Sequence, residues 1–327
     1  MNFNTIYIEE KIKNAKSTKE ILLRIKTKNI IFCDNYGEVF NLKNQNFKIQ
    51  KNNPSLIIAE KKKNLILKTP EKFTIGFKKN YYFSHMLNCI YDCKYCFLQG
   101  MYNSANYVLF VNYKDFQKKI SKISNNSKDP ICFFSGYDCD SLALEKITKF
   151  ADSFLDFFMK FKNIYLEIRT KSTNIDVFKK KVAMKNIIVA FSLNPQSIVN
   201  NFEIKTPSLQ KRINAILELQ KMGWQIGLRF DPIIYTKNFE KIYDKFYKVV
   251  FENLDTKLIH SITIGNFRMP LKFFQKLRKV RPLDAYNFTE TLPNKKNINS
   301  SNSNKELIDF CLSKILKFVP KKKIYLN

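Results

Sequence analysis

The sequence contains no run of about 18 or more apolar residues, so it predicts no membrane-spanning helix. It opens with Met1 to Asn4 and then charged residues, which is not the apolar core of a secretory signal. Its seven cysteines are odd in number and unevenly placed, and this argues against a disulfide framework. Together these absences predict a protein of the reducing cytoplasm.

Acidic residues are also scarce: 28 Asp and Glu stand against 57 Lys and Arg, which gives a formal net charge of +29. Such an excess favours a polyanionic partner, above all nucleic acid. The alternative is a composition bias, because lysine is spread along the chain from Lys11 to Lys323 and Asn and Ile are abundant with it. The composition alone leaves both interpretations open.

Three of the cysteines, Cys89, Cys93 and Cys96, form a C-x3-C-x2-C triplet with no fourth cysteine at close spacing. Thiolates are soft ligands that suit iron–sulfur clusters or zinc. A four-iron cluster normally takes four thiolates, so three would leave one iron open to a small molecule. This spacing predicts S-adenosylmethionine (SAM) on the open iron, with the radical chemistry that SAM supplies. A half-formed zinc site and three ordinary thiols are the alternatives.

From residue 81 onward, short apolar runs alternate with longer helical patterns. We expect strands at residues 82–87, 131–135, 164–169, 187–193, 225–234 and 261–267. We expect helices near residues 114–123, 142–162, 174–183, 207–222, 238–253 and 271–279. This alternation predicts an α/β protein with a parallel sheet and right-handed crossovers.

Six such units suggest a partial (β/α)6 TIM-type barrel of the radical SAM kind. An N-terminal extension over 1–75 would precede the barrel at 76–270, and a C-terminal extension over 271–327 would follow it. Function in such folds gathers at the C-terminal ends of the strands, and the cysteine triplet lies just past the first strand. Ser141 could cap the helix that begins at Leu142.

Several segments resemble the spore photoproduct lyase family of radical SAM DNA repair enzymes. FSHMLNCIYDCKYCFLQG is similar to the family's cluster region, FSGYDCDSLALE to its second-strand segment and RTKSTNID to its third. VAFSLNPQSIVNNFEIKTPSLQKRINAILELQKMGWQIGLRFDPII is similar to the segment of strands four and five. The resemblance runs from about residue 75 to 270, and more faintly to the N-terminus. The triplet alone indicates only radical SAM chemistry. The other quoted segments, which occur in the same order as in the family, narrow the resemblance to spore photoproduct lyase.

The resemblance implies the cofactors and their ligands. The triplet cysteines would hold a [4Fe-4S] cluster, and Tyr95 would act in catalysis close to the adenine of SAM. Three further positions match residues that contact SAM in the family: Ser141, Lys171 and Ser192. Without the resemblance, each serine would be interpreted as a helix cap or turn residue and the lysine as a solvated side chain.

Cys139 lies past the second strand, on the expected active-site face. In the family a cysteine at this place gives a hydrogen atom to the product radical, and a thiol suits that role because its S–H bond is weak. The alternative is a structural cysteine, which is our interpretation of Cys132. The flanking Asp138 and Asp140 predict that the Cys139 thiol is not fully buried.

Two features depart from the family. Phe97 stands where the family usually has tyrosine, so a relay that returns a hydrogen atom to SAM would lack its hydroxyl. SAM would then be consumed, or another tyrosine would substitute. The family's basic, glycine-rich and aromatic hairpin, which probes the lesion, is not found in residues 281–305.

The sequence therefore predicts a radical SAM carbon–carbon lyase that acts on DNA containing a thymine photolesion. An electron donor such as flavodoxin or ferredoxin would reduce the cluster. Lysines would hold the phosphates, and aromatic residues could stack on the bases: Tyr81, Tyr82 or Tyr102. Two alternatives stay open: a radical SAM enzyme of another nucleic acid or a peptide, and a non-enzymatic nucleic-acid-binding protein with a metal.

Overall fold

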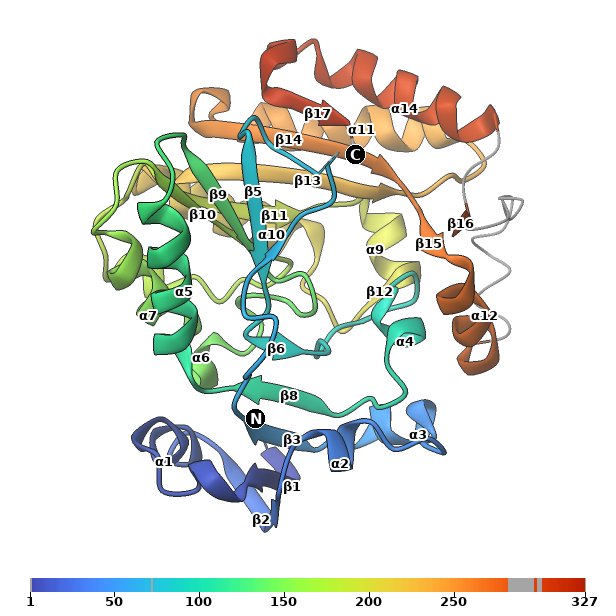
Figure 1. Cartoon of the computed structure of the whole chain (residues 1–327). Helices are drawn as coiled ribbons and strands as arrows, with labels where there is room; N and C mark the ends of the chain where they lie inside the picture. Colours follow the sequence, from blue (N-terminus) through green and yellow to red (C-terminus); the bar gives the residue numbers. More distant parts are fainter. Residues whose placement is uncertain (1, 72, 282–296, 299–301, 327) are drawn as a thin grey trace.

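The larger of two main sheets is the wall of a partial barrel (Figure 1). The computed structural model describes residues 2–71, 73–281, 297–298 and 302–326. The sheet has the strand order β17-β14-β13-β11-β10-β9-β5-β4. In chain order its strands are β4 (Leu67–Lys68), β5 (Lys79–Phe83), β9 (Ile131–Ser135), β10 (Ile164–Thr170), β11 (Ile187–Ser192), β13 (Gln225–Ile233), β14 (Ile259–Asn266) and β17 (Ile324–Leu326).

All neighbouring strands of this sheet are parallel except β4, which pairs antiparallel with β5. The helices that follow and cover the strands are α5 (Tyr113–Asn125), α6 (Glu145–Thr148), α7 (Phe150–Phe158), α8 (Asp176–Lys179), α9 (Gln196–Phe202), α10 (Leu209–Lys221), α11 (Phe239–Asn253), α12 (Leu271–Val280) and α14 (Asn302–Ile315). The predicted partial barrel is confirmed. Among the described residues, no helix is long and apolar enough to cross a membrane.

The helix predicted over residues 142–162 is two helices, α6 and α7. Lys149 breaks it with a left-handed backbone, φ 50°. The Glu145 carboxylate of α6 accepts the N–H groups of Ala151 and Asp152 at 2.9 and 3.1 Å. A carboxylate on the first N–H groups of a helix is a favourable cap, so α6 provides the cap of α7.

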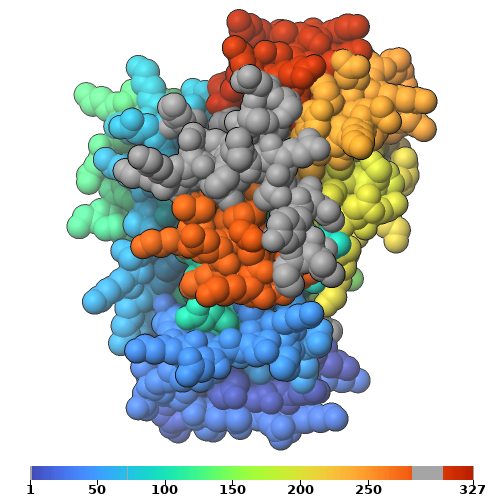
Figure 2. All heavy atoms as spheres, turned by 90° about the vertical axis from the view of Figure 1, so that its right-hand side faces the viewer, coloured from blue at the N-terminus to red at the C-terminus, as the bar shows by residue number. Residues whose placement is uncertain are grey.

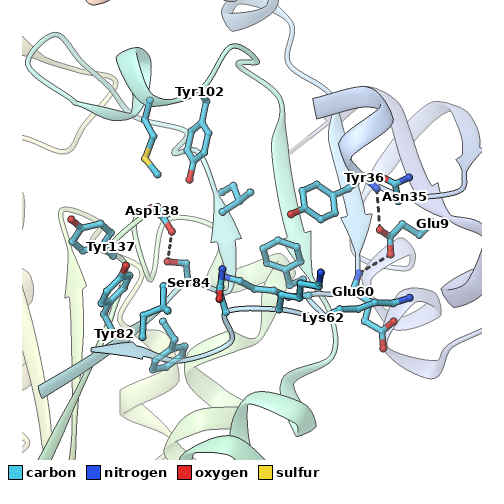
Figure 3. Close-up of a pocket in the computed structure, with 18 of the residues that line it drawn as sticks. Glu9, Asn35, Tyr36, Glu60, Lys62, Tyr82, Ser84, Tyr102, Tyr137 and Asp138 are labelled. Carbon is cyan, nitrogen blue, oxygen red and sulfur yellow. Dashed lines mark hydrogen bonds between the residues drawn. The ribbon is translucent and has the colours of Figure 1, made fainter. Parts of the chain in front are cut away.

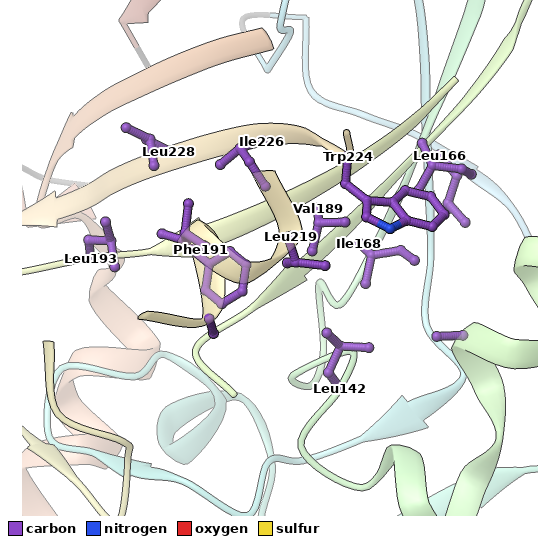
Figure 4. Packing of buried hydrophobic residues seen from close by; sticks show 14 of the residues in the cluster. Leu142, Leu166, Ile168, Val189, Phe191, Leu193, Leu219, Trp224, Ile226 and Leu228 are labelled. Atoms are coloured by element: carbon purple, nitrogen blue, oxygen red, sulfur yellow. The ribbon is translucent and has the colours of Figure 1, made fainter. Parts of the chain in front are cut away.

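The core lies between the sheet and its outer helices. Figure 4 shows side chains of β10, β11 and β13 facing Leu219 of α10 and Leu142. Trp224 is fully buried and meets Phe178 edge-on, with the ring centroids 5.1 Å apart. Gly223, at φ 85°, makes the turn between α10 and Trp224. Because β9 and β11 are buried along their whole length, they appear in the sequence as continuous apolar runs.

The second sheet lies below the barrel in Figure 1, with the order β2-β1-β3-β8-β6. Its strands are β1 (Asn2–Glu9), β2 (Lys26–Cys33), β3 (Leu56–Ala59), β6 (Met86–Leu87) and β8 (Tyr107–Phe110), with α1 (Lys16–Leu22), α2 (Gly37–Phe40) and α3 (Phe47–Asn52) between them. It combines residues before and after position 75, while β17 joins the barrel from beyond position 270. The domain boundaries at residues 75 and 270 therefore remain predictions.

A close contact of two helices fixes Gly100 in α4 (Leu98–Met101). A Cβ atom added there would lie 2.1 Å from the Phe273 carbonyl oxygen of α12, and backbone cannot move aside easily. Gly100→Ala should lower the free energy of unfolding by about 1–3 kcal/mol, measured by chemical denaturation. Gly37→Ala is the control, because a Cβ there meets only side-chain atoms. Equal stability of Gly100→Ala and the native chain would contradict this packing.

Candidate active site

The cysteine triplet lies in a loop beside the C-terminal ends of the barrel strands. Cys93 belongs to β7 (Asp92–Cys93), which pairs antiparallel with β12 (Glu203–Ile204). The Cys96 N–H donates to the Cys93 carbonyl at 3.0 Å. Burial, together with the charges of Asp140 and Cys96, raises the pKa of Cys89 to about 12. The three thiols therefore lie close enough to influence one another electrostatically.

This donor set fits a cluster better than a single metal ion. Nowhere in the described part of the chain do three or more His, Cys, Asp or Glu side chains meet closely enough to hold one ion. A structural zinc needs four such donors around one point. In a four-iron cluster each thiolate binds its own iron, so the sulfur atoms stay farther apart. Three neighbouring thiols suit the three thiolate ligands of a cluster with one open iron.

Two cations from outside the barrel hold the triplet loop. Lys51 of α3 is 9% exposed, and its Nζ donates to the carbonyl oxygens of Cys89 at 2.7 Å and Tyr91 at 3.3 Å. Arg281, directly after α12, forms an ion pair with Asp92. Figure 2 shows α12 (orange) at the surface above the N-terminal segments (blue). The sequence analysis missed both cations, because nothing near them in the sequence marks a contact with the loop.

Behind the triplet loop lies a buried polar network centred on Glu203. Its Oε1 accepts from the Tyr95 hydroxyl and from Asn194 Nδ2 at 3.0 Å, and its Oε2 forms an ion pair with Arg212 Nη2 at 2.6 Å. Burial would raise the pKa of Glu203, but the cations Lys171 and Arg212 outweigh it and lower that pKa. Glu203 is therefore a carboxylate at neutral pH. Glu203 lies in the segment that resembles the family's strands four and five, and no sequence pattern there indicated its role.

The three expected SAM-contact residues all follow strand ends at the same edge of the barrel. Ser192 ends β11, and its carbonyl accepts from Arg212 Nη1 at 3.0 Å. Lys171 follows β10, and its Nζ lies 5.6 Å from the centre of the Tyr95 ring. Ser141 follows β9, and its Oγ lies 2.8 Å from Ser135 Oγ. The placement fits a shared ligand, and contact with SAM stays a prediction.

The helix cap expected of Ser141 is wrong. Asp140 accepts the N–H groups of Leu142 and Ala143 at 3.0 and 2.9 Å, so a carboxylate satisfies the turn that leads to α6. The same carboxylate accepts from the Thr170 hydroxyl and the Lys171 N–H, both at 2.6 Å. Asp140 therefore ties the segment after β9 to the end of β10.

Cys139 is buried, with 7% of its surface exposed, against the expectation that its flanking acids would keep the thiol from full burial. Its two acidic neighbours have partners of their own: Asp140 as described, and Asp138 through Oδ2, which accepts from the Ser84 hydroxyl at 2.6 Å. Cys139 Sγ lies 3.9 Å from Nδ1 of His85, which stacks on Phe150 with the ring centroids 3.8 Å apart.

Burial keeps both members of this pair uncharged. It lowers the pKa of His85 to about 3, and Lys61 adds to that effect. It raises the pKa of Cys139 well above its usual value, and the charges of Cys89 and Asp138 raise it further. Cys139 therefore carries its proton at neutral pH, which is the form that a hydrogen-atom donor needs.

Aromatic side chains surround the position where the family usually has tyrosine. The Phe97 ring lies 5.8 Å from that of Tyr137, and Tyr137 lies 4.5 Å from Tyr82, centre to centre. Tyr81 instead stacks on Phe133 in the barrel core, at 5.5 Å, which argues against its predicted role in base stacking. The sequence predicts that residues 281–305 lack the family's hairpin. Most of these residues lie outside the described part of the chain.

Removing the charge of Glu203 should weaken the fold strongly. Glu203→Gln leaves the buried cations Arg212 and Lys171 without their counterion, so the free energy of unfolding should fall by about 3 kcal/mol or more. Chemical denaturation measures the loss. The control is Glu218→Gln, which removes an exposed ion pair to Lys179 and should change stability little. Equal effects of the two variants would contradict the network.

Comparison with known proteins gives a family match over most of the chain. The family model described as spore photoproduct lyase matches residues 2–280. Spore photoproduct lyase of Clostridium acetobutylicum is 26% identical over 208 residues, which cover 62% of this chain and 61% of that protein. The Bacillus subtilis protein of the same name is 24% identical over 53% of this chain and 50% of its own length. These alignments span one half to about three fifths of the curated relatives.

Solved structures agree in fold over nearly the whole chain. A variant spore photoproduct lyase with bound S-adenosylmethionine and dinucleoside spore photoproduct has a TM-score of 0.82 at 18% identity, covering 99% of this chain and 98% of that one. Another, complexed with dinucleoside spore photoproduct, has a TM-score of 0.80 at 16% identity and the same coverage. At such low sequence identities the likeness to the solved structures shows the fold alone. The family assignment comes from the match of the sequence to the family model. The chain belongs to the spore photoproduct lyase family.

Proposed function

We propose that the chain is a radical SAM carbon–carbon lyase that repairs a thymine photolesion in DNA, with a [4Fe-4S] cluster and SAM as cofactors. The observation that supports this proposal most directly is that the cysteine triplet and the Cys139 thiol lie at the same edge of the barrel. Three neighbouring cysteines suit a cluster with an open iron, and Cys139 lies within electrostatic range of Cys89. Relatives that bind SAM and dinucleoside spore photoproduct support the substrate.

The residues of the site divide the work of holding the cofactors. Cys89, Cys93 and Cys96 would bind three irons of the cluster. Tyr95, Ser141, Lys171 and Ser192 would bind SAM, because two hydroxyls, an ammonium and an aromatic face suit an adenosyl amino acid. When bound and reduced, these cofactors supply a 5′-deoxyadenosyl radical that takes a hydrogen atom from the lesion.

Cys139 would then quench the thymine radical that remains after the cross-link breaks. Its S–H is protonated and shielded, and the neutral His85 ring lies beside it. The shielding keeps other hydrogen donors away from the product radical. To reach this site, the lesion must leave the base stack, as in other enzymes that act on bases. A low-potential donor such as flavodoxin or ferredoxin would supply the electron.

DNA affinity should fall steeply with salt. Each lysine–phosphate contact releases a counterion, which adds about 0.7 to the slope of log affinity against log salt for a single strand. Fluorescence anisotropy of a labelled strand at several salt concentrations measures the slope. An affinity that does not change with salt would mean that the charge of +29 is composition bias.

The decisive experiment is anaerobic incubation of the reconstituted protein with SAM, dithionite and dinucleoside spore photoproduct. Mass spectrometry should detect repaired dinucleoside together with 5′-deoxyadenosine. With Phe97 at the relay position, we expect close to one 5′-deoxyadenosine for each repair. Cleavage of SAM without repair would point to the alternative substrates, RNA or a peptide. No four-iron absorbance and no SAM cleavage would favour the non-enzymatic binder.

A further inference from the structure

A cavity of about 600 Å³ opens between the N-terminal sheet and the first barrel strand. Residues from both of these elements line the cavity. Figure 3 shows Tyr82, Tyr137 and Asp138 on one side and Glu9 with Glu60 on the other. Asp138 directly precedes Cys139, so the cavity adjoins the proposed reaction site. Nothing in the lyase chemistry described above uses this space.

The barrel side of the cavity presents a pair of tyrosine rings. Tyr82 and Tyr137 lie 4.5 Å apart, centre to centre, with 34° between their planes. Tyr137 is 40% exposed although it is large and aromatic. Its other neighbour is Phe97 of the triplet loop, at 5.8 Å. An exposed aromatic face beside a site that acts on DNA suits stacking with a base.

The segment after β3 brings three consecutive lysines, Lys61, Lys62 and Lys63, to the cavity. The Lys61 backbone is held on both sides by Asn112, with N–H and carbonyl bonds of 3.0 Å each. The segment is therefore fixed in place. Lys62 and Lys63 are exposed, and neither forms an ion pair with any described residue.

None of the described acidic residues that line the cavity forms an ion pair with Lys62 or Lys63. The lining holds four acidic and four basic side chains. Lys11 pairs with both Glu9 and Glu60, at 3.1 Å each. The Glu9 carboxylate also accepts two backbone N–H groups, from Tyr36 at 2.9 Å and from residue 60 at 3.0 Å (Figure 3). The side chains of Lys62 and Lys63 are left available to an anion from outside.

We infer that this cavity binds the nucleotide next to the lesion in single-stranded DNA, with its base on the Tyr82–Tyr137 pair and its phosphate at Lys62 and Lys63. The inference rests on the proposed function, since it takes the neighbouring site as the lesion site. It also selects among the aromatic residues expected to stack on bases. Tyr82 is favoured, because Tyr81 stacks on the core residue Phe133 and Tyr102 packs edge-on against Phe40.

The test compares a dinucleoside lesion, which has no neighbour, with a short single strand that carries the same lesion between other nucleotides. Tyr137→Ala and the double variant Lys62→Ala/Lys63→Ala should each lower the ratio of kcat/KM for the strand to kcat/KM for the dinucleoside. A lost stacking contact predicts about tenfold for Tyr137→Ala. Lys180→Ala/Lys185→Ala, which removes two exposed lysines before the N-terminal end of β11, should leave the ratio unchanged.

A binding measurement keeps this inference separate from the proposed function. Anisotropy with a lesion-free labelled strand, without SAM or reductant, should show weaker binding for Tyr137→Ala and a reduced salt slope for the lysine variant. An equal loss of kcat/KM on both substrates, or no loss of strand binding in either variant, would overturn the inference. Native protein that binds the strand through these residues but repairs no dinucleoside would instead overturn the proposed function.

Discussion

Replacing Cys89, Cys93 or Cys96 by alanine should abolish both cluster assembly and SAM cleavage. Each thiolate is expected to bind its own iron, and the alanine side chain offers no donor atom in place of the lost thiolate. The fold should persist, since the loop is also held by the Lys51 contacts and by the pairing of β7 with β12. Iron and sulfide content and the visible absorbance after reconstitution measure the loss.

The matched controls are the two cysteines farthest from this chemistry. Cys33 lies in the edge strand β2, and Cys311 is fully buried beside Tyr247 in the barrel core. Cys33→Ala and Cys311→Ala should keep a full complement of iron. A full cluster in Cys93→Ala would overturn the assignment of the ligands, because that thiol is the most deeply buried of the three.

The sequence was sufficient for the central barrel strands because they are buried on both faces. Such strands are apolar runs bounded by polar turns, and the predicted bounds of β9 are those of the structure. The strand predicted at residues 82–87 was wrong, since β5 ends at Phe83 and Met86–Leu87 form β6 of the second sheet. Helix bounds were close where an amphipathic pattern was long, as in α10 and α11. The pattern failed at 142–162, where the left-handed Lys149 divides a continuous apolar stripe into two helices.

The N-terminal sheet was harder to predict because its neighbours are far apart in the sequence. β1 alternates between buried and exposed residues and pairs with strands that begin at residues 26 and 56. The same reason hid Lys51, which lies 38 residues before the cysteine whose carbonyl it contacts. Local periodicity carries no information on such pairings, so only the tertiary structure brings these groups to the active site.

The contacts of Cys139 could not be read from its sequence neighbours. Two flanking carboxylates normally mark a solvated turn, but here Ser84, Thr170 and backbone N–H groups replace the water around them. The turn can therefore be buried, and the Cys139 thiol is buried with it. His85, the residue beside the thiol, lies 54 positions earlier in the chain. The resemblance implies the role of a hydrogen-atom donor for Cys139, and its burial in the structure gives the reason that the thiol stays protonated.

Cys139→Ala should therefore change the product and not the start of the reaction. The triplet and the expected SAM-contact residues remain in this variant, so SAM cleavage and hydrogen abstraction from the lesion should continue. The product radical would lose its S–H donor, and mass spectrometry should find less repaired thymine and more adducts with other reductants present. Cys132→Ala is the matched control, since Cys132 is also a buried thiol but lies on β9 in a separate part of the core. An unchanged product spectrum in Cys139→Ala would remove this thiol from the mechanism, whereas a parallel loss of SAM cleavage would give it a structural role in the cluster site.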